Sequence, residues 1–145
     1  MIDGNGNIVG TSGIIGGQHN DSYDLRSTIM KIFADLQRNR VAYHHAFFNA
    51  DGGFDTREAR KMLWNRGVRP NIPENKRNRK KAKRGRKRHF NHEVYKNRFV
   101  VERTFAWVDK FRTLLTRFER KDVYWLGFHL IAFTLINLRN LLAKV

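Results

Sequence analysis

A cationic run in the middle of the chain limits how the rest of it can fold. Residues 76–88 hold ten of the 29 Lys and Arg residues, no acid, and no apolar side chain larger than Ala82. Such a segment buries too little apolar surface to fold, and its like charges repel, so we expect it to be extended and mobile without a ligand. The core must therefore come from the segments on either side.

Charge and composition point to a polyanionic partner. The net charge of the 145 residues is +16, and outside the cationic run 19 bases still face 13 acids. Such an excess favours nucleic acid or another anionic surface as partner. With 41% hydrophobic residues the chain can bury one core, so we expect one domain over 1–145 with a mobile basic segment at 74–90. The absence of cysteine excludes disulfides and thiolate metal sites.

Nothing in the pattern predicts a membrane partner. The first residues lack the charged and apolar regions of a signal peptide. The longest apolar stretch, Val123 to Leu138, is interrupted by Gly127 and His129 and is short for a bilayer span of about 20 residues. We expect it to be a buried helix and the protein to be cytoplasmic.

Residue spacing predicts alternating strands and helices, and hence an α/β fold. A turn at Asp3–Gly6 precedes a strand over 7–15, and Asp21 or Ser22 caps the first helix. The remaining expected elements are a helix ending near Arg38, a buried strand over 43–48, a helix over 56–66 closed by Gly67, a strand over 68–72, and helices over 91–118 and 123–142. An inward stripe of Val94, Val101, Phe105, Val108, Phe111, Leu115 and Phe118 is expected on the helix over 91–118.

Two carboxylates stand out against these elements. Asp51 follows the strand over 43–48, while offsets of three and four residues put Tyr95, Arg98 and Glu102 on one helix face. Each has an ordinary alternative, since an Arg and a Glu four apart commonly form a solvated ion pair and an Asp before two glycines is often a turn residue. Two carboxylates beside a polyphosphate-binding segment nevertheless suit a hard divalent cation and chemistry on nucleic acid.

Both strings resemble motifs of the DDE transposases of bacterial insertion sequences, in particular the insertion-sequence-five type within the insertion-sequence-four-like superfamily. The string at 50–55, Ala-Asp-Gly-Gly-Phe-Asp, is similar to the box that carries the second catalytic aspartate. The spacing Tyr95-x2-Arg98-x3-Glu102 is similar to the signature that carries the catalytic glutamate. Further likeness lies at 17–22, at Ile72-Pro73, at 101–107, at 111–120 and in the closing apolar helix.

The resemblance implies a truncated RNase H-like α/β fold, with a short mixed sheet, flanking helices and two long C-terminal helices. It implies three carboxylates that bind two Mg²⁺ (or Mn²⁺) ions for DNA strand cleavage and strand transfer at transposon ends. Asp51 and Glu102 would be two of these catalytic metal ligands. Arg98 would orient Glu102 or contact a phosphate, and Tyr95 would hydrogen-bond DNA near the cleaved end.

The same resemblance makes DNA, both transposon ends and target, the expected partner in the bacterial nucleoid. Self-association or pairing with an upstream-frame half of the transposase is a further expectation. The residues expected to track the DNA backbone are Lys76, Arg77, Arg79, Lys80, Lys81, Lys83, Arg84, Arg86, Lys87 and Arg88.

The chain departs from the family pattern in two places. Asp109 stands where the family often has a lysine, and the strand that carries the first catalytic aspartate has no counterpart. Asp3 has the setting of a turn residue and Asp21 that of a helix cap, so neither is taken as the substitute. His19, His44 and His45 lack a ligand spacing. We therefore expect a partial catalytic domain, inactive alone, from a decayed element or a frameshifted one.

Two non-catalytic alternatives stay open. A basic ribosome-associated protein would use the cationic run as a nucleic-acid arm and leave Asp51 and Glu102 idle. A regulatory fragment would bind transposon ends or the full-length enzyme without cutting. The catalytic hypothesis requires the two carboxylates to converge on one site.

Overall fold

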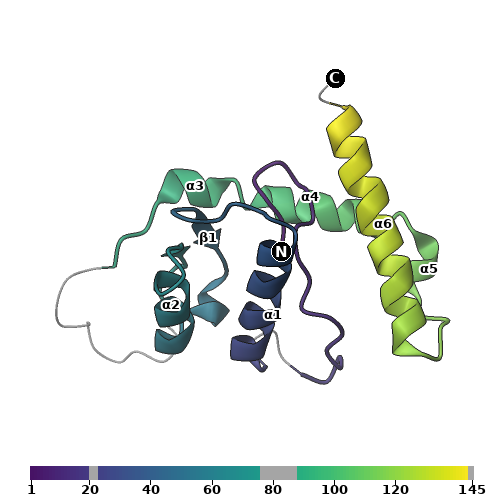
Figure 1. The fold of residues 1–145 in the computed structure, drawn as a ribbon, viewed down its shortest axis with the longest axis horizontal. Coiled ribbons are helices and arrows are strands. Elements are labelled where there is room, and N and C mark those ends of the chain that lie inside the picture. The colour runs from purple at the N-terminus through teal and green to yellow at the C-terminus, as the bar shows by residue number, and fades with distance from the viewer. Residues whose placement is uncertain (20–22, 76–87, 144–145) are drawn as a thin grey trace.

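A computed structural model describes residues 1–19, 23–75 and 88–143. The cap candidates Asp21 and Ser22 and all but the last residue of the cationic run lie outside these ranges. The elements, in chain order (Figure 1), are α1 (Leu25–Arg38), β1 (Phe47–Asn49), the 3₁₀ turn η1 (Gly52–Phe54), α2 (Arg57–Trp64), β2 (Arg69–Asn71), α3 (His92–Lys96), α4 (Phe99–Val108), α5 (Arg112–Leu115) and α6 (Asp122–Leu142).

A short parallel sheet and two helices form the core. β1 pairs with β2 in parallel, with Phe47 opposite Arg69, and α2 connects them. α1 lies beside α2 (Figure 1), as the α/β prediction requires. The sheet differs from the expected mixed sheet, since within the described residues it has two strands and these run parallel. The buried apolar residues are Ile29, Phe33, Leu36, Ala59, Leu63, Val68 and Ile72.

The ends of α2 follow local rules, so the sequence predicts them well. The Thr56 hydroxyl accepts a 3.0 Å hydrogen bond from the backbone N–H of Ala59, which caps the first turn. Gly67 ends the segment with φ +69°, a conformation that a side chain disfavours. A Cβ there would also lie 2.9 Å from the His44 ring.

The helix expected over 91–118 is wrong in extent, since the chain forms α3, α4 and α5 there. Asn91 does cap α3, accepting a 3.0 Å hydrogen bond from Val94 N–H. The first break falls at Asn97, a residue of low helix propensity. Around it the N–H groups of residues 97, 98, 100 and 101 bond to carbonyls three residues back, as in a 3₁₀ turn. The inward stripe is wrong in part, because these shorter helices bury Val100, Thr104 and Leu114 and leave Phe105, Leu115 and Phe118 exposed.

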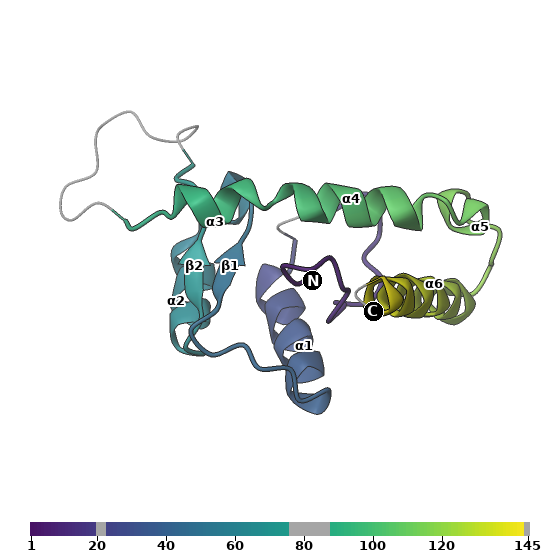
Figure 2. The same ribbon diagram turned by 90° about the horizontal axis from the view of Figure 1, so that it is seen from above.

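α6 confirms the expected helix but not its expected burial. Among its described residues only Ala132 and Ile136 are buried, because α6 contacts α4 and α5 (Figure 2) and the N-terminal segment and leaves much of its apolar surface exposed. By length and composition α6 could cross a membrane, and 11% of its most apolar window is buried. Core helices of water-soluble proteins pass the same test, so this finding carries no assignment.

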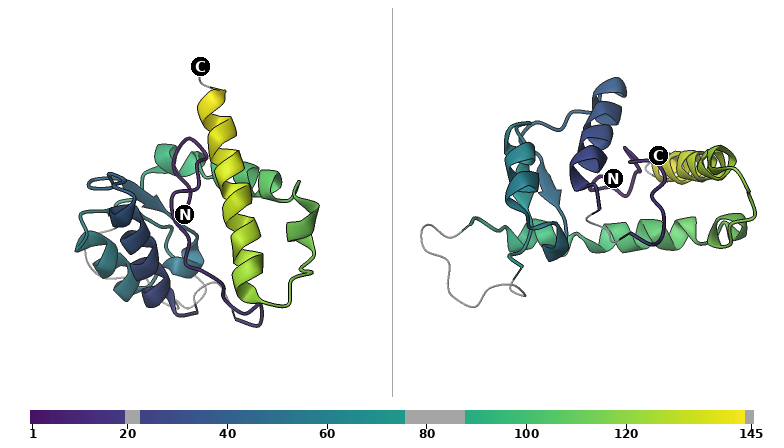
Figure 3. Two further views of the ribbon diagram at one scale, coloured as in Figure 1. Left: turned by 45° about the vertical axis from the view of Figure 1, so that its right-hand side comes forward. Right: turned by 90° about the horizontal axis from the view of Figure 1, so that it is seen from below.

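The N-terminal segment passes between α1 and α6 (Figure 3) without forming the strand expected over 7–15. A single antiparallel bridge joins Ile2 to Ile8. The side-chain amide of Asn137 takes the place of a partner strand, accepting from Ile8 N–H at 2.7 Å and donating to Ile8 O at 2.8 Å. This pairing attaches the segment to α6 and satisfies backbone groups that a sheet would otherwise satisfy.

The amide of Asn71 joins the sheet to α3. This side chain is 1% exposed on β2, and its Nδ2 donates to Asn49 Oδ1 at 2.7 Å and to Asn91 O at 2.9 Å. Its Oδ1 accepts from Asn91 N–H at 2.8 Å. Asn49 in turn donates to the Val94 carbonyl at 3.3 Å. One buried polar network therefore holds the ends of β1 and β2 against the start of α3.

Asp55 forms a second buried network on the far side of η1. Its side chain is 1% exposed and pairs with Arg60, at 2.8 Å, and with Arg88. Arg60 also donates to the Ile72 carbonyl at 2.6 Å, and Asp55 Oδ2 accepts from Asn75 N–H at 3.0 Å. One carboxylate thus binds Asn75, just before the cationic run, and Arg88, the last residue of the run.

Replacing Asn71 should be costly for stability. Asn71→Ala leaves the backbone groups of Asn91 and the side-chain oxygen of Asn49 without these partners, and an unsatisfied buried polar group costs about 1–3 kcal/mol. We expect urea unfolding to show a loss of about 2–4 kcal/mol. The exposed Asn65→Ala is the matched control, with a change within about 0.5 kcal/mol. Equal losses in both variants would contradict the role given to Asn71.

The Asp55 network should make stability depend on pH. Burial acts to raise the pKa of the Asp55 carboxyl, but its hydrogen bonds and the charges of Arg60 and Arg88 outweigh burial and lower the pKa. A depressed folded pKa gives stability that is complete above the ordinary carboxyl pKa of about 3.9 and is lost as pH falls through the folded value.

We therefore expect Asp55→Asn to cost about 3 kcal/mol at pH 7 and progressively less below about pH 4, as followed by urea unfolding at several pH values. Glu93→Gln, which removes an exposed partner of Lys96, should change little at any pH. A cost of Asp55→Asn that is the same at pH 7 and at low pH would contradict this account.

Candidate active site

Arg98 brings together the residues singled out in the two motifs. Its Nη1 forms an ion pair with Asp51 Oδ1, and its Nη2 lies 3.8 Å from Glu102 Oε1. Nη1 also donates to the Tyr95 hydroxyl at 3.1 Å, and this hydroxyl lies 3.5 Å from Asp51 Oδ1. Two carboxylates from distant parts of the sequence therefore meet on one guanidinium.

The backbone leaves the Asp51 carboxylate available for such contacts. Asp51 follows β1 in an extended conformation, with φ −68° and ψ 162°, and stands at the start of η1. Its side chain makes no capping hydrogen bond there, although a turn role is the usual one for an Asp in this setting. The carboxylate is 56% exposed and points its Oδ1 at Arg98.

The junction between α3 and α4 places the other three residues. Tyr95 lies on α3, Arg98 in the junction and Glu102 in the first turn of α4, and α3 leads into α4 along one side of the molecule (Figure 2). Hydrogen bonds to the residue three positions back align Arg98 with Tyr95, as in a 3₁₀ turn. The first turn of a helix also favours an acid such as Glu102.

The site is open and its charge suits a cation. The hydrogen bond to Tyr95, with the negative charges of Asp51 and Glu102, raises the pKa of Arg98 above its usual range, so the guanidinium is charged at all working pH values. Exposed ion pairs such as Arg98–Glu102 stabilise a fold by at most about 1 kcal/mol. The cluster therefore contributes little to folding, and its two acids exceed its one base.

Asp51 and Glu102 are the kind of ligand that a hard divalent cation prefers, but they are two carboxylates where the resemblance implies three. Carboxylate oxygens are the ligands that Mg²⁺ and Mn²⁺ prefer. Within residues 1–19, 23–75 and 88–143, no group of three or more acidic, His or Cys side chains could hold a metal. Asp3 is confirmed as a turn residue, since its Oδ1 accepts from the backbone N–H groups of Asn5 and Asn7. His19 stacks on Tyr23 and His44 on Tyr43.

The residues expected to contact DNA are for the most part outside the described ranges. Of the ten bases, only Arg88 is described, and it pairs with the buried Asp55. Its side chain is 24% exposed, so Arg88 has a structural role that its place in a basic run does not suggest. The other nine residues keep their assignment as a prediction.

Sequence reasoning missed the residues that hold the site in place. Asn71 and Asn49 fix the sheet against α3, and Arg60 and Asp55 fix α2 against the chain after β2. A signal for Asn71 exists, because it is the one uncharged polar residue in the strand expected over 68–72. A polar residue in a buried strand requires partners, and the residue types alone do not say which.

Comparison with known proteins places both motifs in one family. Residues 48–139 match the family described as Transposase DDE domain. A transposase assigned to insertion sequence element IS402 of Burkholderia cepacia is 38% identical over 86 residues, which make up 59% of this chain and 33% of that protein. The match thus spans about a third of that relative's length. No solved structure shows significant similarity.

The family match takes in the end of β1, Asp51, the α3–α4 junction and most of α6. The two carboxylates and the guanidinium between them therefore all fall inside it. The chain belongs to the transposase DDE domain family.

Proposed function

We propose that this chain acts in DNA transposition through a metal site to which Asp51 and Glu102 contribute. The observation that carries the proposal is their convergence on Arg98, with Tyr95 beside them. Within the transposase family we propose the insertion-sequence-five type and an RNase H-like fold, which the parallel β1–α2–β2 unit supports. The proposed partners are transposon ends and target DNA in the bacterial cytoplasm.

Each of the four residues has a proposed role. Asp51 and Glu102 would hold a divalent cation, Mg²⁺ or Mn²⁺, which when bound stabilises the attacking and leaving oxygens in phosphoryl transfer. Arg98 would move from the carboxylates to a DNA phosphate, which it can contact with two N–H groups. The Tyr95 hydroxyl accepts a hydrogen bond from Arg98 in this structure. In the complex it would hydrogen-bond the DNA near the cleaved end.

A three-carboxylate site needs one acid from outside the described residues. We propose that strand cleavage and strand transfer require this third ligand, and that Asp51 and Glu102 alone give a weak cation site. The rival, a nucleic-acid-binding protein without catalysis, explains the +16 charge equally well. Cation binding at the two carboxylates separates these functions.

Removing either carboxylate should weaken cation binding. We expect Asp51→Asn and Glu102→Gln each to lower Mn²⁺ affinity about tenfold or more, since each removes a charged ligand. The measurement is Mn²⁺ titration followed by electron paramagnetic resonance at neutral pH. Glu93→Gln, an acid 81% exposed on α3, is the control with wild-type affinity. The same affinity in all four proteins would reject the shared site.

Removing Arg98 should have the opposite effect on the same titration. Arg98→Gln deletes the positive charge that now occupies both carboxylates, so Mn²⁺ should bind more tightly than in the wild type. Arg98→Lys keeps the charge and should restore weak binding. A loss of Mn²⁺ binding in Arg98→Gln, with an unchanged urea midpoint, would mean that Arg98 positions the ligands and does not compete with the cation.

A further inference from the structure

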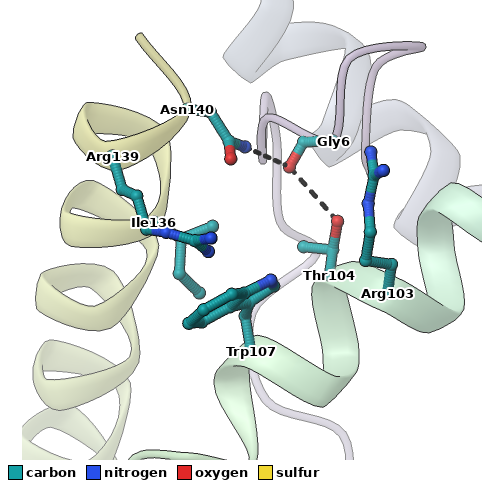
Figure 4. A pocket seen from close by; sticks show the side chains of 7 residues that line it. All are labelled: Gly6, Arg103, Thr104, Trp107, Ile136, Arg139 and Asn140. Carbon is teal, nitrogen blue, oxygen red and sulfur yellow. Dashed lines mark hydrogen bonds between the residues drawn. The ribbon is translucent and has the colours of Figure 1, made fainter. Parts of the chain in front are cut away.

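A polar cavity lies where α4 and α6 approach each other. It has a volume of about 200 Å³ and is lined by residues of both helices and by Gly6 of the N-terminal segment. Figure 4 shows the Arg139 side chain reaching from α6 to the Trp107 ring on α4. The cavity is distinct from the Asp51–Arg98–Glu102 cluster, since none of these three residues lines it.

Two positively charged side chains lie over the Trp107 ring. The Arg139 guanidinium carbon lies 3.2 Å from the centroid of the Trp107 ring, and Lys110 Nζ lies 3.7 Å from it. Arg103, one helical turn before Trp107, also lines the cavity. The ring is half-buried, whereas all three cationic side chains are exposed.

These cations have no counter-ion in the part of the chain that the structure describes. None of Arg103, Lys110 and Arg139 takes part in any of its ion pairs. The neutral polar groups of the cavity are used internally, because the Gly6 carbonyl accepts from Thr104 at 3.2 Å and from Asn140 at 3.1 Å (Figure 4). Arg139 and Lys110 both lie over the Trp107 ring, so their like charges repel each other, and an anion would offset this repulsion.

We propose that Arg139, stacked on Trp107, binds a phosphate of the DNA backbone. A guanidinium stacked on an aromatic face keeps its N–H edges available and matches a phosphate with two hydrogen bonds. This inference rests on the proposed function, which supplies DNA as the partner.

Fluorescence of Trp107 tests the site directly. A chain with Trp64→Phe and Trp125→Phe keeps Trp107 as its single tryptophan, and it is titrated with inorganic phosphate and with a DNA duplex. We expect both to change the emission, and Arg139→Gln to abolish both responses. Because Arg139→Gln removes one cation from the phosphate backbone, it should also lower the slope of log affinity for the duplex against log salt by about 0.9. Arg139→Lys should recover part of the affinity.

Arg38→Gln is the control for loss of one positive charge, since Arg38 is 78% exposed and ends α1. It should leave the emission responses unchanged. Duplex binding without any response of Trp107 would overturn this inference and leave the proposed function standing. A response to phosphate but none to a bound duplex would reject DNA as the ligand. A wild-type chain that binds no duplex would overturn the proposed function, and the phosphate titration would then report on an anion site alone.

Discussion

The buried amide of Asn71 is the contact on which the arrangement of the site depends. It pairs with both backbone groups of Asn91 and with the side chain of Asn49, so it fixes the start of α3 against the strand that leads to Asp51. The exposed ion pairs of Arg98 are too weak to do this, because pairs in solvent are worth at most about 1 kcal/mol. The relative positions of the two carboxylates therefore depend on the neutral hydrogen bonds that Asn71 makes with Asn49 and Asn91.

The buried residues that position the proposed site are separate from the exposed residues that form it. Asn71 and Asp55 are buried and have several partners each, and they connect β2, α2 and α3 with the chain on both sides of the cationic run. Asp51, Arg98 and Glu102 are exposed, at 56%, 38% and 73%, and remain accessible to a large ligand. A DNA-processing site needs both properties, since groups that contact a duplex must be open to it and yet fixed in place.

Local signals made much of this fold predictable. The helix starts at Thr56 and Asn91, the turn at Asp3 and the extent of α6 follow from short-range rules, and the structure confirms them. The breaks between α3, α4 and α5 and the exposed face of α6 did not follow, because apolar spacing indicates a face without saying what covers it. Nor does spacing predict that Asn137 replaces a strand beside Ile8. The sequence placed Tyr95, Arg98 and Glu102 together, but their meeting with Asp51 depends on tertiary contacts.

The central claim is that Asp51 and Glu102 share one cation site although they come from different parts of the chain. Nuclear magnetic resonance with substoichiometric Mn²⁺ tests it most directly, because the ion broadens signals of nearby residues. We predict that broadening begins together at the amides of Asp51, Arg98 and Glu102 and is strongly reduced at all three in the Glu102→Gln variant at the same Mn²⁺ concentration. Broadening that affects Asp51 and leaves Glu102 sharp, or that centres on another part of the chain, would contradict the account.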